Sequence, residues 1–151
     1  MKTLKTIITV FLLFQTTVSF GQTKEETISW LKDKLEKHLM PFQYDKETIK
    51  DVRLISIDAC QFIVSSTGTL KDDGSVHKYL ETFPIKNDSL SSDGYFKYTG
   101  DKILFERDGV KRYRNNSSLY ISNAIEEDII PRVEKALKHL ATFCPKKKET
   151  F

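Results

Sequence analysis

The sequence predicts an α+β fold with an N-terminal amphipathic helix, six or seven mostly antiparallel strands, and a C-terminal helix packed on the sheet. Three observations lead to this prediction. Apolar residues recur at helical spacing near both ends of the chain, whereas apolar and polar residues alternate between about residues 50 and 122. Asp-Gly and Ser/Asn-rich segments separate the alternating stretches. We expect the strands to form a curled sheet or a barrel.

The first 21 residues have the pattern of a cleaved export signal. Two lysines precede the apolar run 7–14, and Ser19 and Gly21 are small residues suited to a signal-peptidase cut before Gln22, or next before Thr23. The run is shorter than the about 20 residues that span a bilayer, so we expect no transmembrane segment in the mature chain. We expect an exported protein, periplasmic or extracellular. The predicted parts are a signal peptide over 1–21, a single α+β domain over 22–145 and a basic flexible tail over 146–151.

The charge balance argues against a nucleic-acid partner. The chain has 24 basic and 21 acidic residues, and the signal contains two of the lysines and no acid, so the mature part is close to neutral. About 130 mature residues bury roughly two-thirds of their unfolded surface in a single domain. Such a domain needs no metal or cofactor to fold, and we expect none.

Helical patterns mark both ends of the domain. Thr23 and Glu26 match a capping box at the start of the first helix, which should end at Met40-Pro41. Asp128 is the expected N-cap of the second helix, which Pro145 should stop. The expected buried stripes are Ile28, Leu31, Leu35 and Leu39 in the first helix, and Ile129, Val133, Leu137, Leu140 and Cys144 in the second.

The middle of the chain predicts strands. Between Val52 and Val64 the apolar face switches at Ala59-Cys60 with no Gly or Pro, which predicts one long strand with a bulge or bend that ends at 65–68. The next strand covers 76–85, with Pro84 at a sheet edge. A polar loop, 87–94, precedes four short strands near 95–98, 102–106, 110–114 and 119–121, which turns at 99–101, 108–109 and 115–118 separate.

The two cysteines, Cys60 and Cys144, allow two interpretations. In an oxidising compartment they could form a disulfide, and closing so long a loop would contribute at most about 4 to 5 kcal/mol. Alternatively, they are two buried thiols that act as small apolar residues. The sequence does not place their Cα atoms within bridging distance, so both interpretations stay open.

Catalytic and metal motifs are absent from the sequence. The three histidines have no metal-ligand partners at a recognised spacing, and no nucleophile or phosphate-loop motif occurs, so no catalytic, cofactor-binding or metal residue is predicted. Asp58 lies two positions from Cys60, but a catalytic cysteine needs a base and an electropositive setting, and the sequence supplies neither locally. His77, Tyr79 and Glu81 share one face of a strand. They could line a groove, but we favour a polar outer face of the sheet.

The most distinctive local feature is a basic hairpin around Asp108-Gly109, whose members are Arg107, Lys111, Arg112, Tyr113 and Arg114. Arginines form forked hydrogen bonds with phosphate and carboxylate groups. The hairpin could therefore bind a lipid headgroup, a polysaccharide or a partner protein of the cell envelope. Alternatively, its charges prevent the edge of the sheet from pairing with other chains.

The order of elements over about residues 50–145 is similar to that of the pleckstrin-homology-like barrel, to which an N-terminal helix is added. Some barrels of this type bind ligands through hairpin loops, and this analogy implies the same for the basic hairpin. The leader and the start Gln22-Thr23-Lys24-Glu25-Glu26 resemble small uncharacterised exported proteins of Bacteroidota. That second resemblance implies a periplasmic or surface location and no activity.

Two functions are consistent with these features. The preferred hypothesis is a non-catalytic extracytoplasmic binding or interaction module, whose sheet edge or basic hairpin meets an envelope component or another protein. The alternative is a small envelope hydrolase or other enzyme with an atypical site. A pocket that holds His77 with a carboxylate in hydrogen-bonding distance would favour the enzyme.

Overall fold

A computed structural model describes residues 23–85 and 95–145. The predicted export signal, the loop 87–94 and the basic tail lie outside these residues. Within them, no helix is long and apolar enough to cross a membrane.

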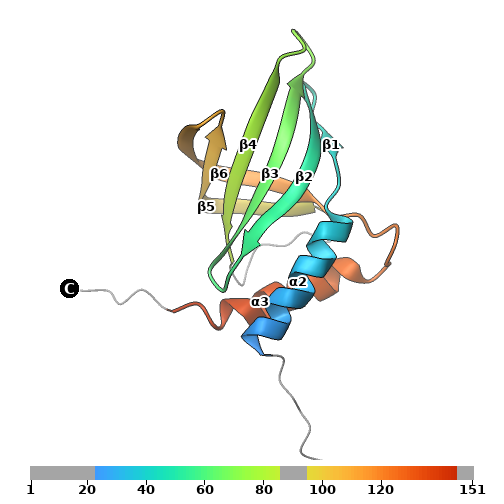
Figure 1. The fold of residues 1–151 in the computed structure, drawn as a ribbon, viewed down its shortest axis with the longest axis vertical. Helices are drawn as coiled ribbons and strands as arrows, with labels where there is room; N and C mark the ends of the chain where they lie inside the picture. Colours follow the sequence, from blue (N-terminus) through green and yellow to red (C-terminus); the bar gives the residue numbers. More distant parts are fainter. Residues whose placement is uncertain (1–22, 86–94, 146–151) are drawn as a thin grey trace, which may run out of the picture.

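The structure confirms the α+β fold (Figure 1). Six strands form one antiparallel sheet in sequential order, β1 to β6, and this sheet curls without closing. The two helices pack side by side at one end of the sheet. The elements are α2 (Lys24–His38), β1 (Phe42–Gln43), β2 (Glu47–Ile57), β3 (Gln61–Leu70), β4 (Val76–Pro84), β5 (Tyr95–Arg107), β6 (Val110–Tyr120) and α3 (Ile129–Ala141).

Both helices begin where the sequence predicts. The Thr23 hydroxyl accepts a hydrogen bond from the Glu26 backbone N–H at 3.1 Å, and the Glu26 carboxylate accepts one from the Thr23 N–H at 2.9 Å. Asp128 occupies the N-cap position of α3 without a side-chain cap bond, because its carboxylate lies 3.5 Å from Arg132 instead. The helix α3 ends at Ala141, so Cys144 lies beyond it and not on its stripe.

The main core lies between the helices and one end of the concave face of the sheet. Phe62 and Phe83 stack there with ring centroids 4.9 Å apart, and Leu31 of α2 and Val133 of α3 are fully buried against the same cluster. The predicted stripes of both helices face this cluster, with Ile28 only partly buried. Packing of these apolar faces holds the helices on the sheet.

The stretch 52–64 corrects the sequence interpretation, because it is a hairpin and not one bent strand. The Asp58 side chain accepts hydrogen bonds from the backbone N–H groups of Cys60 at 2.7 Å and Gln61 at 2.9 Å, which makes a tight turn without Gly or Pro. The face switch at 59–60 therefore marks the turn between β2 and β3. The strand β3 also continues past Gly68, to Leu70, whereas the sequence predicts a strand end at 65–68.

The four short strands expected after residue 94 are two long ones, β5 and β6. The expected turns at 99–101 and 115–118 lie opposite each other in one ladder, where Thr99 pairs with Asn116 and a register shift absorbs the extra residues. The hairpin at Asp108-Gly109 is confirmed, with φ of 49° and 86° at the two turn residues. The strand β4 is an interior strand, and Pro84 lies beyond the segment 79–82 that pairs with β5.

A disulfide joins Cys60 to Cys144, whose Cα atoms are 4.9 Å apart and whose sequence separation is 84. It ties the turn between β2 and β3 to the segment that follows α3. This cross-link fastens the C-terminal helix to the end of the sheet that forms the core.

We predict that replacing both cysteines, Cys60→Ser with Cys144→Ser, lowers the free energy of unfolding by about 2 to 4 kcal/mol. The physical reason is the loop-closure entropy that the cross-link removes from the unfolded chain. Denaturant titration of the oxidised protein and of the double variant measures the difference. Reductant should bring the native protein to the level of the variant and leave the variant unchanged. Equal stability of the two proteins would contradict a stabilising role of the disulfide.

Candidate functional site

The concave face of the sheet changes character along β4. Phe83 lies in the core beneath the helices, whereas Glu81, Tyr79 and His77 follow on the same face toward the open end, because alternate residues of a strand share a face. Tyr79 is only 8% exposed. The interpretation of these residues as a polar outer face was therefore wrong, since the curl of the sheet turns this face inward.

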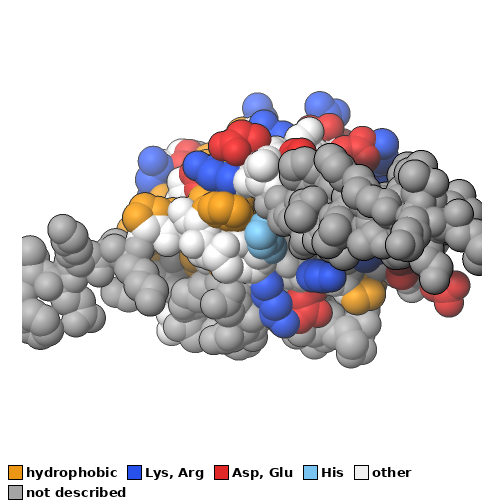
Figure 2. Space-filling view, turned by 90° about the horizontal axis from the view of Figure 1, so that it is seen from below, with side chains coloured by type: hydrophobic (Ala, Val, Ile, Leu, Met, Phe, Trp, Pro, Cys, Tyr) orange, Lys and Arg blue, Asp and Glu red, His pale blue; other side chains and the backbone are white. Residues whose placement is uncertain are grey.

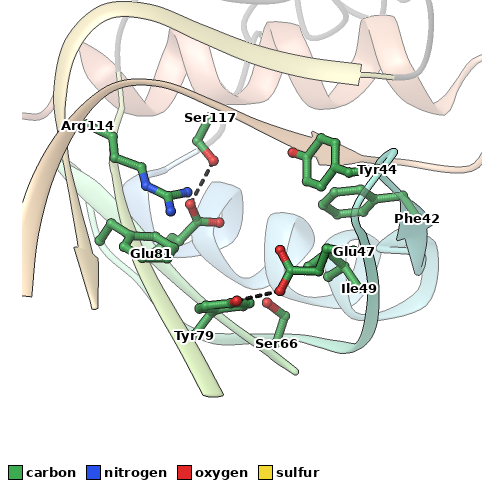
Figure 3. Close-up of a pocket in the computed structure, with 10 residues that line it drawn as sticks. Phe42, Tyr44, Glu47, Ile49, Ser66, Tyr79, Glu81, Arg114 and Ser117 are labelled. Carbon is green, nitrogen blue, oxygen red and sulfur yellow. Dashed lines mark hydrogen bonds between the residues drawn. The ribbon is translucent and has the colours of Figure 1, made fainter. Parts of the chain in front are cut away.

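A small pocket of about 40 Å³ lies at this open end (Figure 3). Its volume accommodates a few water molecules or one small polar group, not a whole cofactor. It combines carboxylates, hydroxyls, aromatic rings and one guanidinium from all six strands and the turn after β1. The lining residues are Phe42, Tyr44, Glu47, Ile49, Ser66, Tyr79, Glu81, Phe105, Arg114 and Ser117.

One side of the pocket is a tyrosine–carboxylate pair. The Tyr79 hydroxyl donates a hydrogen bond to Glu47. Burial, and secondly the bond to Glu47 and its negative charge, raise the pKa of Tyr79 to about 12. Gly68 makes room for the pair, because a Cβ at this position would overlap both the Glu47 carboxylate and the Tyr79 ring.

The other side of the pocket is formed by Glu81 and Arg114. Burial raises the pKa of Glu81, while the hydroxyl of Ser117, which donates to Glu81 at 2.7 Å, and the charge of Arg114 act in the opposite direction. Burial lowers the pKa of Arg114, and Glu81 opposes this effect. The Arg114 guanidinium lies 3.3 Å from the ring centroid of Phe105. Glu81 and Arg114 thus depend on their neighbours to replace the hydration that burial removes.

The structure divides the predicted basic hairpin between the two faces of the sheet. Arg112 pairs with Phe105 in the ladder and Arg107 pairs with the buried Tyr79, so both arginines share the concave side with Arg114. The other two members of the hairpin point to the convex side. Lys111 lies 3.7 Å from Glu106, and Tyr113 is 66% exposed. We call the three concave-side arginines, Arg107, Arg112 and Arg114, the arginine rim.

His77 connects the turn of the hairpin to the start of β4. Its Nδ1 lies 2.7 Å from Asp108 Oδ2, and its Nε2 lies 3.1 Å from the Ser75 hydroxyl and accepts from Arg107. Because a guanidinium only donates, the proton of the neutral ring belongs on Nδ1, which donates to Asp108. The backbone N–H of Lys78, at 2.8 Å, and then His77 lower the pKa of Asp108.

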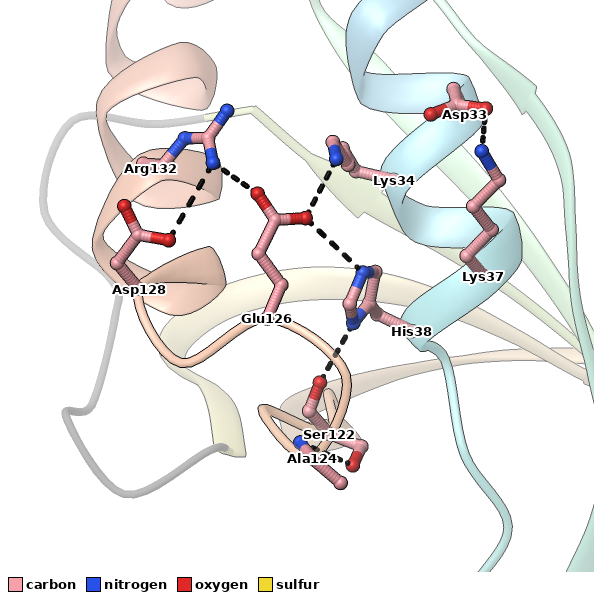
Figure 4. A network of polar contacts seen from close by, with 9 residues as sticks. All are labelled: Asp33, Lys34, Lys37, His38, Ser122, Ala124, Glu126, Asp128 and Arg132. Carbon is pink, nitrogen blue, oxygen red and sulfur yellow. Dashed lines mark hydrogen bonds and ion pairs between the residues drawn. The ribbon is translucent and has the colours of Figure 1, made fainter.

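A second polar cluster lies between the helices and holds the chain before α3 (Figure 4). Glu126 bridges Lys34 at 2.6 Å and Arg132, and Lys34 is the main cause of its lowered pKa. His38 is 2% exposed and places Nδ1 2.8 Å from the carbonyl of Ser122. These contacts are local and mutually satisfied, so we assign the cluster a structural role.

The surface at the helix end of the molecule carries charges of both signs. Acidic and basic side chains lie next to one another there, among a few hydrophobic ones (Figure 2). A face of mixed charge does not attract one kind of ion strongly. Among the described residues, no group of three or more metal-ligating side chains lies together.

Several pocket residues escaped the sequence interpretation. Phe42, Tyr44 and Glu47 come from β1, the turn after it and β2, about 30 to 75 positions before the lining residues of β4, β5 and β6. No local motif marks them, because only the curl of the sheet brings them to β4 and β6. Gly68 carried a usable signal, since a glycine inside an alternating strand often marks a close approach. The sequence interpretation took it as the end of the strand instead.

Comparisons with protein-family models, with curated proteins and with solved structures found no match to this chain. The likeness to the pleckstrin-homology-like barrel and to exported proteins of Bacteroidota therefore stays a prediction. The chemistry of the pocket and of the arginine rim is the basis for assigning a role.

We predict that Gly68→Ala breaks the bond between Tyr79 and Glu47, because the added methyl group occupies their space. The pKa of Tyr79 should fall from about 12 toward its ordinary value of 10.0, and overpacking should cost about 1 to 3 kcal/mol. Titration of the labelled tyrosine rings by NMR measures the shift. In the native protein, the stability from this residue is present below pH 10 and lost as the pH rises through the folded pKa.

Gly74→Ala provides the matched control for this prediction. Gly74 has a φ of 71° and open space around it, so the substitution strains a turn without contact to the pocket. It should lower stability and leave the pKa of Tyr79 unchanged. The close-packing explanation is wrong if both variants shift the pKa of Tyr79 alike, or if neither does.

Proposed function

We propose that this chain is a non-catalytic extracytoplasmic binding module, which receives an anionic group of an envelope component or a partner protein at the arginine rim. One observation supports this proposal above all. A single hairpin directs Arg107, Arg112 and Arg114 to the concave side at the open end of the sheet, beside a pocket with room for one small group.

The three arginines differ in how far their charge is already balanced. Arg114 lies beside Glu81 (Figure 3), and Arg107 contacts His77 and lies 3.9 Å from Asp108. Within the described residues, Arg112 forms no ion pair, and its guanidinium lies 5.1 Å from the ring centroid of Phe105. An exposed guanidinium held over a ring keeps its N–H groups available for a carboxylate or phosphate. Arg112 is thus the best-placed residue to receive an anion.

The small pocket favours a large partner that inserts one group. A lipid headgroup, an anionic polysaccharide and an acidic protein segment all carry such groups. The disulfide between Cys60 and Cys144 supports an oxidising location, because disulfides persist in the periplasm and outside the cell. The near-neutral charge of the mature chain argues against nucleic acid.

We predict that Arg112→Gln weakens binding of the anionic partner about 10- to 100-fold, the value of a hydrogen bond to a charged group. Phosphatidylglycerol vesicles, polygalacturonate and a glutamate-rich peptide serve as probes for the three partner classes. Fluorescence anisotropy or co-sedimentation at fixed salt measures affinity. Thermal unfolding should stay within about 0.5 kcal/mol of the native protein, because Arg112 is exposed.

Lys111→Gln removes the same charge from the convex side and is the control. It should leave binding within about twofold, since Lys111 points away from the pocket. Equal losses in both variants would indicate attraction to net charge alone. Unchanged affinity in Arg112→Gln for every probe that binds would refute the role of the rim.

One observation favours the alternative of a small envelope hydrolase. Ser75, His77 and Asp108 are arranged like the serine, histidine and aspartate of an acyl-transfer triad. The Ser75 hydroxyl contacts His77 Nε2, and the Asp108 carboxylate contacts His77 Nδ1. Two features count against it. Arg107 donates to the same Nε2 that would have to take the serine proton, and none of the three residues lines the pocket. We therefore interpret these contacts as structural, because they hold the hairpin turn at Asp108 against the start of β4.

A fluorophosphonate probe distinguishes the two functions, because it labels an activated serine covalently. We predict no adduct on Ser75 by intact-mass measurement and no turnover of p-nitrophenyl acetate above that of the Ser75→Ala variant. An adduct on Ser75 that disappears in His77→Asn would establish the hydrolase and overturn the binding-module proposal.

A further inference from the structure

We infer that the open edge of β6 binds an extended acidic segment of a partner protein as an additional strand of the sheet. This inference rests on the proposed function and names its partner class. It starts from the seam between β1 and β6, the two ends of the strand order.

The seam is closed at one end and open at the other. Leu39, just after α2, forms an antiparallel bridge with Ile121, and the Met40 N–H donates to the Tyr120 carbonyl at 3.1 Å. Beyond this point, the ladder of β6 within the described residues is with β5 only, and β1 pairs only with β2. The edge of β6 thus already accepts an antiparallel neighbour at residues 120–122, and along its remaining length no other described segment pairs with it.

The open part of the seam is hollow. The pocket is lined from one side by Phe42 and Tyr44 and from the other by Arg114 and Ser117 of β6 (Figure 3). A strand added along β6 would therefore pass over the pocket, and one of its side chains could enter it. The pocket is small and already contains the carboxylates of Glu47 and Glu81, so it fits a small neutral side chain of the added strand, and the acidic side chains are left to the arginines beside it.

Backbone groups of β6 are available to pair with such a strand. In a hairpin with a two-residue turn, the flanking pair, here Arg107 and Val110, exchanges hydrogen bonds, and bonded and unbonded pairs alternate from there. By this rule, the N–H and C=O groups of Lys111 and Tyr113 point away from β5, toward the open edge. An extended peptide can bind through these groups irrespective of its side chains.

The charge of the edge selects the partner. Alternate side chains of an added strand would meet Arg112 and Arg114 on the concave side, and the intervening ones would lie on the convex side, away from these two arginines. Acidic residues on the concave side form charge-assisted bonds with the hairpin. A second copy of this chain would instead place its own lysine and arginines against the same cations, so we favour an acidic partner over self-pairing.

The decisive comparison is Tyr113→Pro against Tyr113→Ala. Both remove the exposed tyrosine side chain, but only proline removes the N–H on the open edge, where its loss costs no bond to β5. The probe is a fluorescent peptide of alternating threonine and glutamate, and anisotropy measures its affinity. We expect Tyr113→Ala to bind within about threefold of the native protein and Tyr113→Pro to lose at least about tenfold. A peptide in which lysine replaces glutamate should not bind.

Hydrogen exchange of the native protein gives a second measurement that needs no variant. Bound peptide should slow exchange of the Lys111 and Tyr113 amides, and unchanged exchange at both would overturn strand addition. If Arg112→Gln loses the peptide while Tyr113→Pro keeps it, the arginine rim stands and the added strand is wrong. If the acidic peptide does not bind while anionic vesicles do, the partner class is wrong.

Discussion

The position of the hydrophobic core governs the rest of this structure. Apolar side chains on the concave face, with Phe62 and Phe83 at their centre, pack against α2 and α3 at only one end of the curled sheet. The disulfide and the Glu126 cluster fasten the helices and their connections at that end. Because the helices cover no more of the sheet, the other end of the concave face is left to polar and aromatic residues. The pocket and the arginine rim are consequences of this uneven covering.

The open end is stabilised by compensation between groups that would each be unfavourable alone. Glu81 loses hydration by burial, and Ser117 and Arg114 restore part of what it loses. Arg114 is itself desolvated and gains from Phe105 and Glu81. Such a network stabilises the fold only when all its members are present. Removal of one member leaves its partners buried without a compensating interaction. Arg112 is exposed and does not take part in this compensation. It is therefore available for binding, whereas Glu81 and Arg114 are needed for folding.

Local signals in the sequence predicted both helices and the Asp108-Gly109 hairpin, because capping, apolar stripes and turn chemistry act over a few residues. Longer-range features were missed. Asp58 forms a turn through its own side chain, a signal weaker than Gly or Pro, and the polar stretch 115–118 is held extended by its ladder with β5. The division of the basic hairpin was predictable in principle, since a two-residue turn with alternation places Arg112 and Tyr113 on opposite faces. Ser117 was not, because its phase relative to Arg114 changes where the β5–β6 register shifts.

The same uneven covering explains why the sheet does not close. Closure into a barrel would require β1 to pair along β6, but β1 is only two residues long. Among the described residues, the pairing between this part of the chain and the end of β6 is limited to residues 38–40, which precede β1. A longer β1 would fill the seam, cover the pocket and satisfy the edge of β6. The chain instead leaves this edge beside cations of one sign, which disfavours pairing with another copy of itself and favours an oppositely charged strand. The feature that protects the edge from aggregation is thus the same feature that would give it a specific partner.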